Sequence, residues 1–150
     1  MSDPPTVLLL SGPNLNLLGQ REPDVYGTTT LEDHVASAVA AGKARGLTVE
    51  HLQSNHEGDL VEAIQGARDR CAAIVINPGA FTHYAWSIHD ALASFDGIIV
   101  ELHISNPDAR EAWRHTSVVS PVARGSIMGF GGLGYPMAIN AVADLLSSLH

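Results

Sequence analysis

The three residues Glu101-Leu102-His103 close an apolar run and could carry acid–base chemistry. Side chains alternate between the two faces of a strand, so Glu101 and His103 would share one face. A carboxylate beside a histidine can orient the ring and favour its protonated form, as a general acid requires. Two other interpretations stay open: a structural hydrogen-bonded pair, and a metal site completed by His83. The chain has no His-Glu-x-x-His zinc pattern, so metal is the least favoured.

A polar segment of about residues 19–28 holds a second candidate pair, Arg21 and Tyr26. The segment shows neither helical nor strand periodicity, and glycines stand near both of its ends. One interpretation is a surface loop, which the spacing alone favours. The other is an active-site lid that brings Arg21 and Tyr26 over a bound ligand.

Two arginines, Arg110 and Arg114, follow the sequence Asn106-Pro107. Asparagine as a cap followed by proline at the first position predicts a short helix, which would place both arginines on one face. They could be solvated and paired with nearby acids, or one could reach a hydroxylated anion. The planar guanidinium group suits carboxylates and hydroxyl clusters.

Short apolar runs alternate with helical patterns along the chain, which predicts a single α/β domain with a doubly wound, flavodoxin-like sheet of five parallel strands. A capping box is predicted at Thr29-Thr30-Leu31-Glu32, and the helix that follows should turn Val39 inward. The predicted strands are Thr6–Leu10, Leu47–Leu52, Ala72–Asn77, Gly97–His103 and about Ala123–Met128. The predicted helices span about 31–45, 59–70 and 83–94, with a short helix after Asn106 and a long one near the C-terminus.

Ligands bind such sheets beyond the carboxyl ends of the strands. Polar residues follow four of the predicted strands, so one edge of the sheet should collect asparagine, histidine, serine and glutamate side chains. The first of these loops, residues 12–19, is neither a Gly-x-Gly-x-x-Gly motif nor a phosphate loop ending in Gly-Lys-Ser/Thr. The loop therefore argues against nucleotide binding through those motifs.

Composition narrows the function classes further. The chain of 150 residues has a net charge of −8, which argues against a nucleic-acid partner. Its single cysteine, Cys71, suits a reducing compartment, and no apolar stretch reaches the roughly 18–20 residues that span a bilayer. We expect a cytoplasmic protein with no membrane association and a disordered N-terminus over residues 1–5.

Six stretches together resemble the type II 3-dehydroquinate dehydratase family. The resemblance covers about Val7 to Leu146. The stretches that carry it are Leu10-Ser11-Gly12-Pro13-Asn14-Leu15-Asn16-Leu17-Leu18-Gly19 with Arg21-Glu22-Pro23 and Tyr26-Gly27, Gln53-Ser54-Asn55-His56-Glu57-Gly58, Asn77-Pro78-Gly79-Ala80-Phe81-Thr82-His83, Glu101-Leu102-His103-Ile104-Ser105-Asn106, Ala109-Arg110-Glu111 with Arg114-His115, and Gly129 to Tyr135.

The resemblance implies a hydro-lyase that converts 3-dehydroquinate to 3-dehydroshikimate by anti elimination through an enolate, without cofactor or metal. This reaction serves both aromatic biosynthesis through the shikimate pathway and quinate breakdown. The resemblance also implies a homododecamer built as a tetramer of trimers. Tyr26 would take the C2 proton with Arg21 beside it, and Asn14 would help hold a water that stabilises the enolate. His103, oriented by Glu101, would protonate the leaving hydroxyl.

The remaining site residues are also carried over by resemblance. Ile104 and Ser105 would bind the substrate carboxylate, partly through backbone amides. The ring hydroxyls would be bound by Asn77, His83 and Arg114. Asp90 would reach the site of a neighbouring subunit, and Arg110 would be mainly structural.

The sequence departs from the common family pattern around these groups without removing one of them. Phe81 stands where tyrosine is frequent, and His89 stands before Asp90 where arginine is usual. Two other classes stay open: a flavodoxin-like binding module, such as a flavin carrier or receiver domain, and a metal-dependent hydrolase. A receiver domain needs acidic residues after its first strand, where this chain has Ser11-Gly12-Pro13-Asn14.

Overall fold

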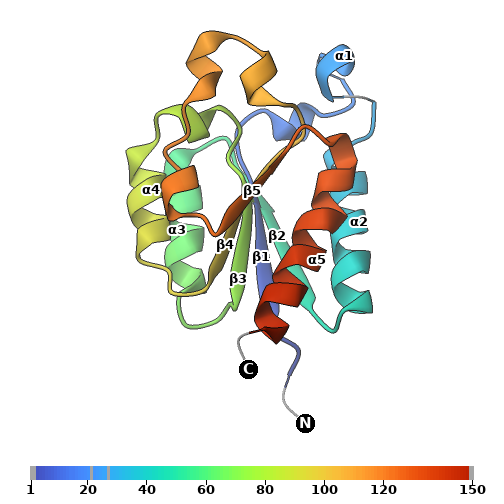
Figure 1. Ribbon diagram of the computed structural model, residues 1–150, viewed down its shortest axis with the longest axis vertical. Helices are drawn as coiled ribbons and strands as arrows, with labels where there is room; N and C mark the ends of the chain where they lie inside the picture. The colour runs from blue at the N-terminus through green and yellow to red at the C-terminus, as the bar shows by residue number, and fades with distance from the viewer. Residues whose placement is uncertain (1–2, 21, 27, 149–150) are drawn as a thin grey trace.

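One parallel sheet forms the centre of the molecule. The computed structural model describes residues 3–20, 22–26 and 28–148, and only the backbone at 25 and 26. The sheet order is β2-β1-β3-β4-β5 (Figure 1). This flavodoxin-like order confirms the predicted fold class. The strands are β1 (Thr6–Ser11), β2 (Thr48–Gln53), β3 (Ala73–Asn77), β4 (Ile98–His103) and β5 (Gly125–Met128), each within two residues of its prediction.

Helices cover both faces of this sheet (Figure 1). α2 (Leu31–Ala44) and α5 (Gly134–Ser147) pack on one face, and α3 (Glu57–Ala67) and α4 (Trp86–Ala93) on the other. Every residue of β3 and β4 is buried as a result, which explains the nearly continuous apolar runs.

Two loops approach each other closely where β1 and β3 end. The Gly12 amide donates to the Asn77 carbonyl at 2.8 Å, and a Cβ on Gly12 would lie 2.3 Å from the Pro78 carbonyl oxygen. Gly79 adopts a φ of +58°, where a side chain is strained. Glycine at these positions therefore lets the two loops meet at the carboxyl edge of the sheet.

Two details of the first helix differ from prediction. The capping box joins Thr30 to Asp33, one residue later than predicted, so Glu32 lies within the first turn. Val39 is 42% exposed, and His34 takes an inward position instead, stacked on Tyr135 with ring centroids 4.9 Å apart. The prediction searched for apolar residues at helical spacing, so it did not assign the polar His34 to the buried face.

Several short turns replace longer predicted helices. The helix expected from His83 begins at Trp86, after a 3-10 turn over Gly79–His83. The one expected after Asn106 is split into 3-10 turns at Pro107–Ala109 and Ala112–His115, although Asn106 caps the first as predicted. The polar segment contains a single helical turn, α1 (Pro23–Tyr26), which is too short to show periodicity.

Candidate active site

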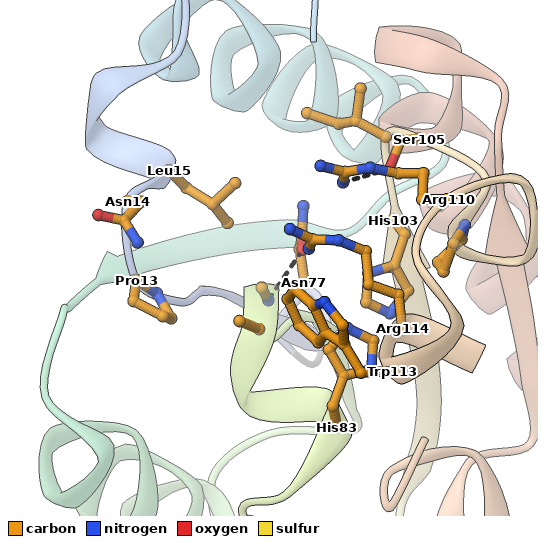
Figure 2. Close-up of a pocket in the computed structure, with 14 residues that line it drawn as sticks. Pro13, Asn14, Leu15, Asn77, His83, His103, Ser105, Arg110, Trp113 and Arg114 are labelled. Carbon is orange, nitrogen blue, oxygen red and sulfur yellow. Dashed lines mark hydrogen bonds between the residues drawn. The ribbon is translucent and has the colours of Figure 1, made fainter. Parts of the chain in front are cut away.

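A cavity of about 200 Å³ opens at the carboxyl edge of the sheet (Figure 2). This volume is below the roughly 300–1,000 Å³ of sites for drug-sized ligands, so it suits a compact molecule. The loops after β1, β3 and β4 form its walls, together with the turn at Ala112–His115. The lining residues are Pro13, Asn14, Leu15, Asn77, Gly79, Ala80, His83, His103, Ile104, Ser105, Pro107, Arg110, Trp113 and Arg114.

The charge of this cavity contrasts with that of the chain. The net charge of the chain is −8, yet the lining contains two arginines, two histidines and, among the described residues, no carboxylate. Figure 2 shows Arg110, Arg114 and His103 on one side, facing Pro13, Asn14 and Leu15 on the other. The arrangement favours a small anion with hydroxyl groups.

The Glu101–His103 pair stands at the end of β4 as the alternation predicted. His103 Nε2 lies 2.6 Å from Glu101 Oε2, and both side chains are buried. His103 lines the cavity and Glu101 lies behind it. With Nε2 held by the carboxylate, Nδ1 is the ring nitrogen left for a ligand.

Glu101 is ionised despite its burial. Burial alone would raise its pKa, but the hydrogen bond and charge of His103, with the hydroxyls of Ser120 and Thr82, lower the pKa of Glu101 to about 2. A fixed negative charge therefore sits behind His103 at neutral pH.

Two polar residues at and after the end of β3, Asn77 and His83, also line the cavity. Asn77 is 3% exposed; its Oδ1 accepts from the Gly79 amide at 3.2 Å and its Nδ2 donates to the Tyr135 hydroxyl at 3.4 Å. His83 Nδ1 donates to the Thr116 carbonyl at 2.7 Å. Burial lowers the pKa of His83, so at neutral pH its Nε2 is free of a proton and can accept a hydrogen bond.

The two arginines are held in place by different partners. Arg110 Nη1 donates to Ser105 Oγ at 3.2 Å, so it orders a lining residue as well as facing the cavity. Arg114 Nε donates to Glu111 at 2.6 Å, and its guanidinium carbon lies 4.0 Å from the centroid of the Trp113 ring. Both arginines thus reach the cavity, although the predicted helix that was to align them is broken.

The polar segment of residues 19–28 begins and ends at neighbouring points. A Cβ on Gly19 would lie 2.8 Å from the Thr28 carbonyl oxygen, so the segment leaves and rejoins the chain at one place. Glu22 lies 3.9 Å from Arg110 Nη2, which brings the start of the segment to one residue of the cavity wall, although Glu22 is not part of the lining. Arg21 and the Tyr26 side chain lie outside the described residues; the Tyr26 backbone ends α1.

Seven of the residues proposed for the site line the cavity: Asn14, Asn77, His83, His103, Ile104, Ser105 and Arg114. Asn14 adopts a φ of 68°, and its amide donates to Asn55 Oδ1 at 3.0 Å, which fixes the β1 loop against the β2 loop. Asp90 is exposed on α4 and is not in the lining. Trp113, which the sequence analysis did not single out, also borders the cavity and contacts both Arg114 and His83.

One ring nitrogen of each histidine is already engaged, because Nε2 of His103 faces Glu101 and Nδ1 of His83 faces the Thr116 carbonyl. Across residues 3–20, 22–26 and 28–148 no group of three His, Cys, Asp or Glu side chains could hold a metal ion. Over the same part of the chain, none of the helices has the length and apolar character needed to cross a membrane.

Fold and cavity together define an α/β domain whose cationic cavity suits small hydroxylated anions. The chain belongs to the class II dehydroquinase family, whose model matches residues 5–143. It is 53% identical over 142 residues to the 3-dehydroquinate dehydratase of Ruegeria pomeroyi, covering 95% of each chain. A catabolic 3-dehydroquinase of Aspergillus clavatus is 54% identical over 138 residues, with 92% of each chain covered.

The solved structures agree with this family. The crystal structure of type II dehydroquinase from Propionibacterium acnes superposes with a TM-score of 0.91 at 42% identity. The superposition covers 96% of this chain and 99% of that one.

Proposed function

We propose that the chain is a hydro-lyase that removes water from 3-dehydroquinate to give 3-dehydroshikimate. The observation that carries this is the cavity itself, where two arginines and His83 lie around the His103–Glu101 pair, with no acid in the described lining. The substrate is a small anion with ring hydroxyls, which matches that chemistry. The similarity to 3-dehydroquinate dehydratases supports the same reaction.

The proposed mechanism is an anti elimination through an enolate. Tyr26, as a phenolate beside Arg21, takes the C2 proton, which is acidic because a ketone is adjacent. The Asn14 side chain helps hold a water that stabilises the enolate oxygen. The enolate then expels the hydroxyl, and His103 protonates it so that one water leaves. Glu101 orients His103 throughout.

Substrate binding is proposed to use the rest of the lining. Ile104 and Ser105 hold the carboxylate, while Asn77, His83 and Arg114 bind the ring hydroxyls. The segment of residues 19–28 closes over the bound substrate and excludes water. No cofactor or metal takes part in this scheme, and the lone cysteine suits the cytoplasm.

The assembly is proposed to be a homododecamer, a tetramer of trimers. Asp90 is exposed and outside the lining of its own cavity, as expected if it serves a neighbour. Tyr84 and Trp86, 58% and 62% exposed, lie close by in the chain, and large aromatic side chains are typical of subunit interfaces. Light scattering should give twelve times the mass of one chain. An active monomer would contradict this assembly.

The direct test is to add 3-dehydroquinate and follow the ultraviolet absorbance of the conjugated enone product. The wild-type chain should produce a steady rise that survives a chelator, and His103→Ala should produce almost none. A folded wild-type chain that gives no rise would overturn the proposal. Loss of the rise in chelator would instead favour the metal-dependent alternative.

A further inference from the structure

The Glu101 carboxylate receives more hydrogen bonds than a histidine–carboxylate pair needs. Glu101 is fully buried on β4. Its Oε2 accepts from Thr82 Oγ1 and from His103 Nε2, both at 2.6 Å. Its Oε1 accepts from Ser120 Oγ at 2.6 Å, and Ser117 Oγ lies 3.0 Å from both oxygens. Three hydroxyls and one imidazole therefore surround a single carboxylate.

The three hydroxyls come from two separate segments that the main chain joins. Thr82 lies in the turn after β3, whereas Ser117 and Ser120 lie in the segment that leads to β5. The Val118 amide donates to the Thr82 carbonyl at 2.7 Å, and His89 Nδ1 donates to the Val118 carbonyl at 2.7 Å. These two hydrogen bonds thus fix the backbone that carries the hydroxyls.

Hydroxyl geometry directs the protons toward the carboxylate. Ser117 Oγ accepts from the amides of Val119 at 3.1 Å and Ser120 at 3.0 Å, which occupies its two lone pairs. Its single proton is then left for Glu101. Thr82 Oγ1, 2.9 Å from that oxygen, finds no free lone pair there and donates to Glu101 as well.

We propose that Thr82 and Ser120 are positioning residues for the acid of the reaction, because they hold Glu101 as an anion that accepts the Nε2 proton of His103 without taking it. Each of the two takes one carboxylate oxygen. With the Nε2–H fixed on Glu101, His103 presents Nδ1 to the leaving hydroxyl in every turnover. This kinetic role rests on the proposed function, whereas the effect on Glu101 does not.

The first test follows the carboxyl carbon of Glu101 by NMR in chain labelled with ¹³C-glutamate. The double variant Thr82→Val/Ser120→Ala removes one 2.6 Å donor from each oxygen and spares Ser117, whose loss would also free two amides. Starting from about 2, the pKa of Glu101 should rise by about one unit or more for each hydroxyl lost. The pair Thr82→Ser/Ser120→Thr, which keeps both hydroxyls, should restore the low value.

Ser54→Ala is the matched control, since Ser54 is a buried serine that donates to another carboxylate, Asp59, at 2.7 Å. It should leave the Glu101 titration unchanged. Should the double variant fail to fold by circular dichroism, Ser120→Ala alone replaces it, because Ser120 lies at the exposed side of the cluster.

The second test compares kcat of the double variant with that of the wild type from pH 7.5 down to pH 4, so that the range reaches the raised pKa of about 4 expected for Glu101 in the variant. The ratio should fall as the pH falls, because more of Glu101 becomes protonated, while KM changes by less than about twofold. A Glu101 pKa equal to that of the wild type, or a ratio independent of pH, would overturn the proposal. Absence of turnover in the wild type would instead count against the proposed function, and the NMR arm would still decide the role of the hydroxyls.

Discussion

The two sides of the cavity are built in different ways. His103 lies at the end of β4 and is buried. Its ring is held by Glu101, whose carboxylate accepts hydrogen bonds from three hydroxyl groups. Tyr26 belongs to a segment that leaves the body of the protein at Gly19 and returns at Thr28. The described part of that segment contacts the cavity wall through Glu22, 3.9 Å from Arg110.

This contrast fits the work proposed for each side. An acid that must give its proton to a fixed hydroxyl gains from a rigid strand end, where its orientation is set before substrate arrives. A base carried on a loop can approach after the substrate has entered and can exclude water as it closes. With the acid on a strand and the base on a loop, the site can be open while substrate enters and closed while the reaction takes place.

The largest expected effect on kcat comes from substituting His103 or Glu101, on the strand side of the cavity. His103→Ala should lower kcat by about 10²–10⁴-fold with a smaller change in KM, because general acid catalysis is lost. Glu101→Gln should cost less, about 10–100-fold, since the imidazole remains but loses its orienting charge. Steady-state kinetics at neutral pH would check both. Normal turnover in both variants would place the acid elsewhere.

A smaller effect is expected on the loop side from Arg21. Arg21→Ala should reduce kcat by about tenfold to 100-fold, because a cation beside the tyrosine favours phenolate. Arg21→Lys should recover part of that loss, as it keeps the charge but not the planar fork. Equal kcat in the lysine and alanine variants would mean that charge is not what the residue provides.

Sequence reasoning predicted these two sides to different extents. The spacing of Glu101 and His103 on a strand was sufficient to place them together. The hydroxyls around Glu101 lie 16 to 19 residues away in the chain, so no local pattern could reveal them. The assignment of Tyr26 came from resemblance alone, since the single turn of α1 has no period to detect.

The parallel sheet was predictable because apolar strands covered on both faces leave a continuous pattern. The short turns were not, because 3-10 geometry at Pro107–Ala109 and Ala112–His115 depends on tertiary contacts. Trp113 was missed for a similar reason: its contacts with Arg114 and His83 depend on two turns meeting in space.

Glu101, on the strand side of the cavity, should also affect the free energy of unfolding. The pKa of Glu101 is about 2 in the fold against 4.5 unperturbed, so its ionised form stabilises the fold above pH 4.5 by about 3 kcal/mol. This contribution is lost as pH falls from 4.5 toward 2. Urea unfolding should show Glu101→Gln less stable than wild type at pH 7, with a difference that shrinks over this range. A difference constant with pH would contradict the assigned ionisation.

We expect no covalent adduct to form at the single lysine of the chain. Lys43, the single lysine, is exposed in the last turn of α2, outside the cavity lining. An imine mechanism would need it, so borohydride with substrate should leave the chain active and unlabelled. Mass spectrometry would check for an adduct, and one at Lys43 would refute the enolate route without a covalent intermediate.

Deuterium exchange directly tests the assignment of the base to the loop side of the cavity and of the acid to the strand side. In heavy water, His103→Ala should still exchange the C2 proton of 3-dehydroquinate, because Tyr26 can form the enolate although water cannot leave. Tyr26→Phe, which removes the basic oxygen, should neither exchange that proton nor release water. NMR of the remaining substrate would follow both variants. Exchange retained in Tyr26→Phe and lost in His103→Ala would contradict the assignment of base and acid to the loop and the strand.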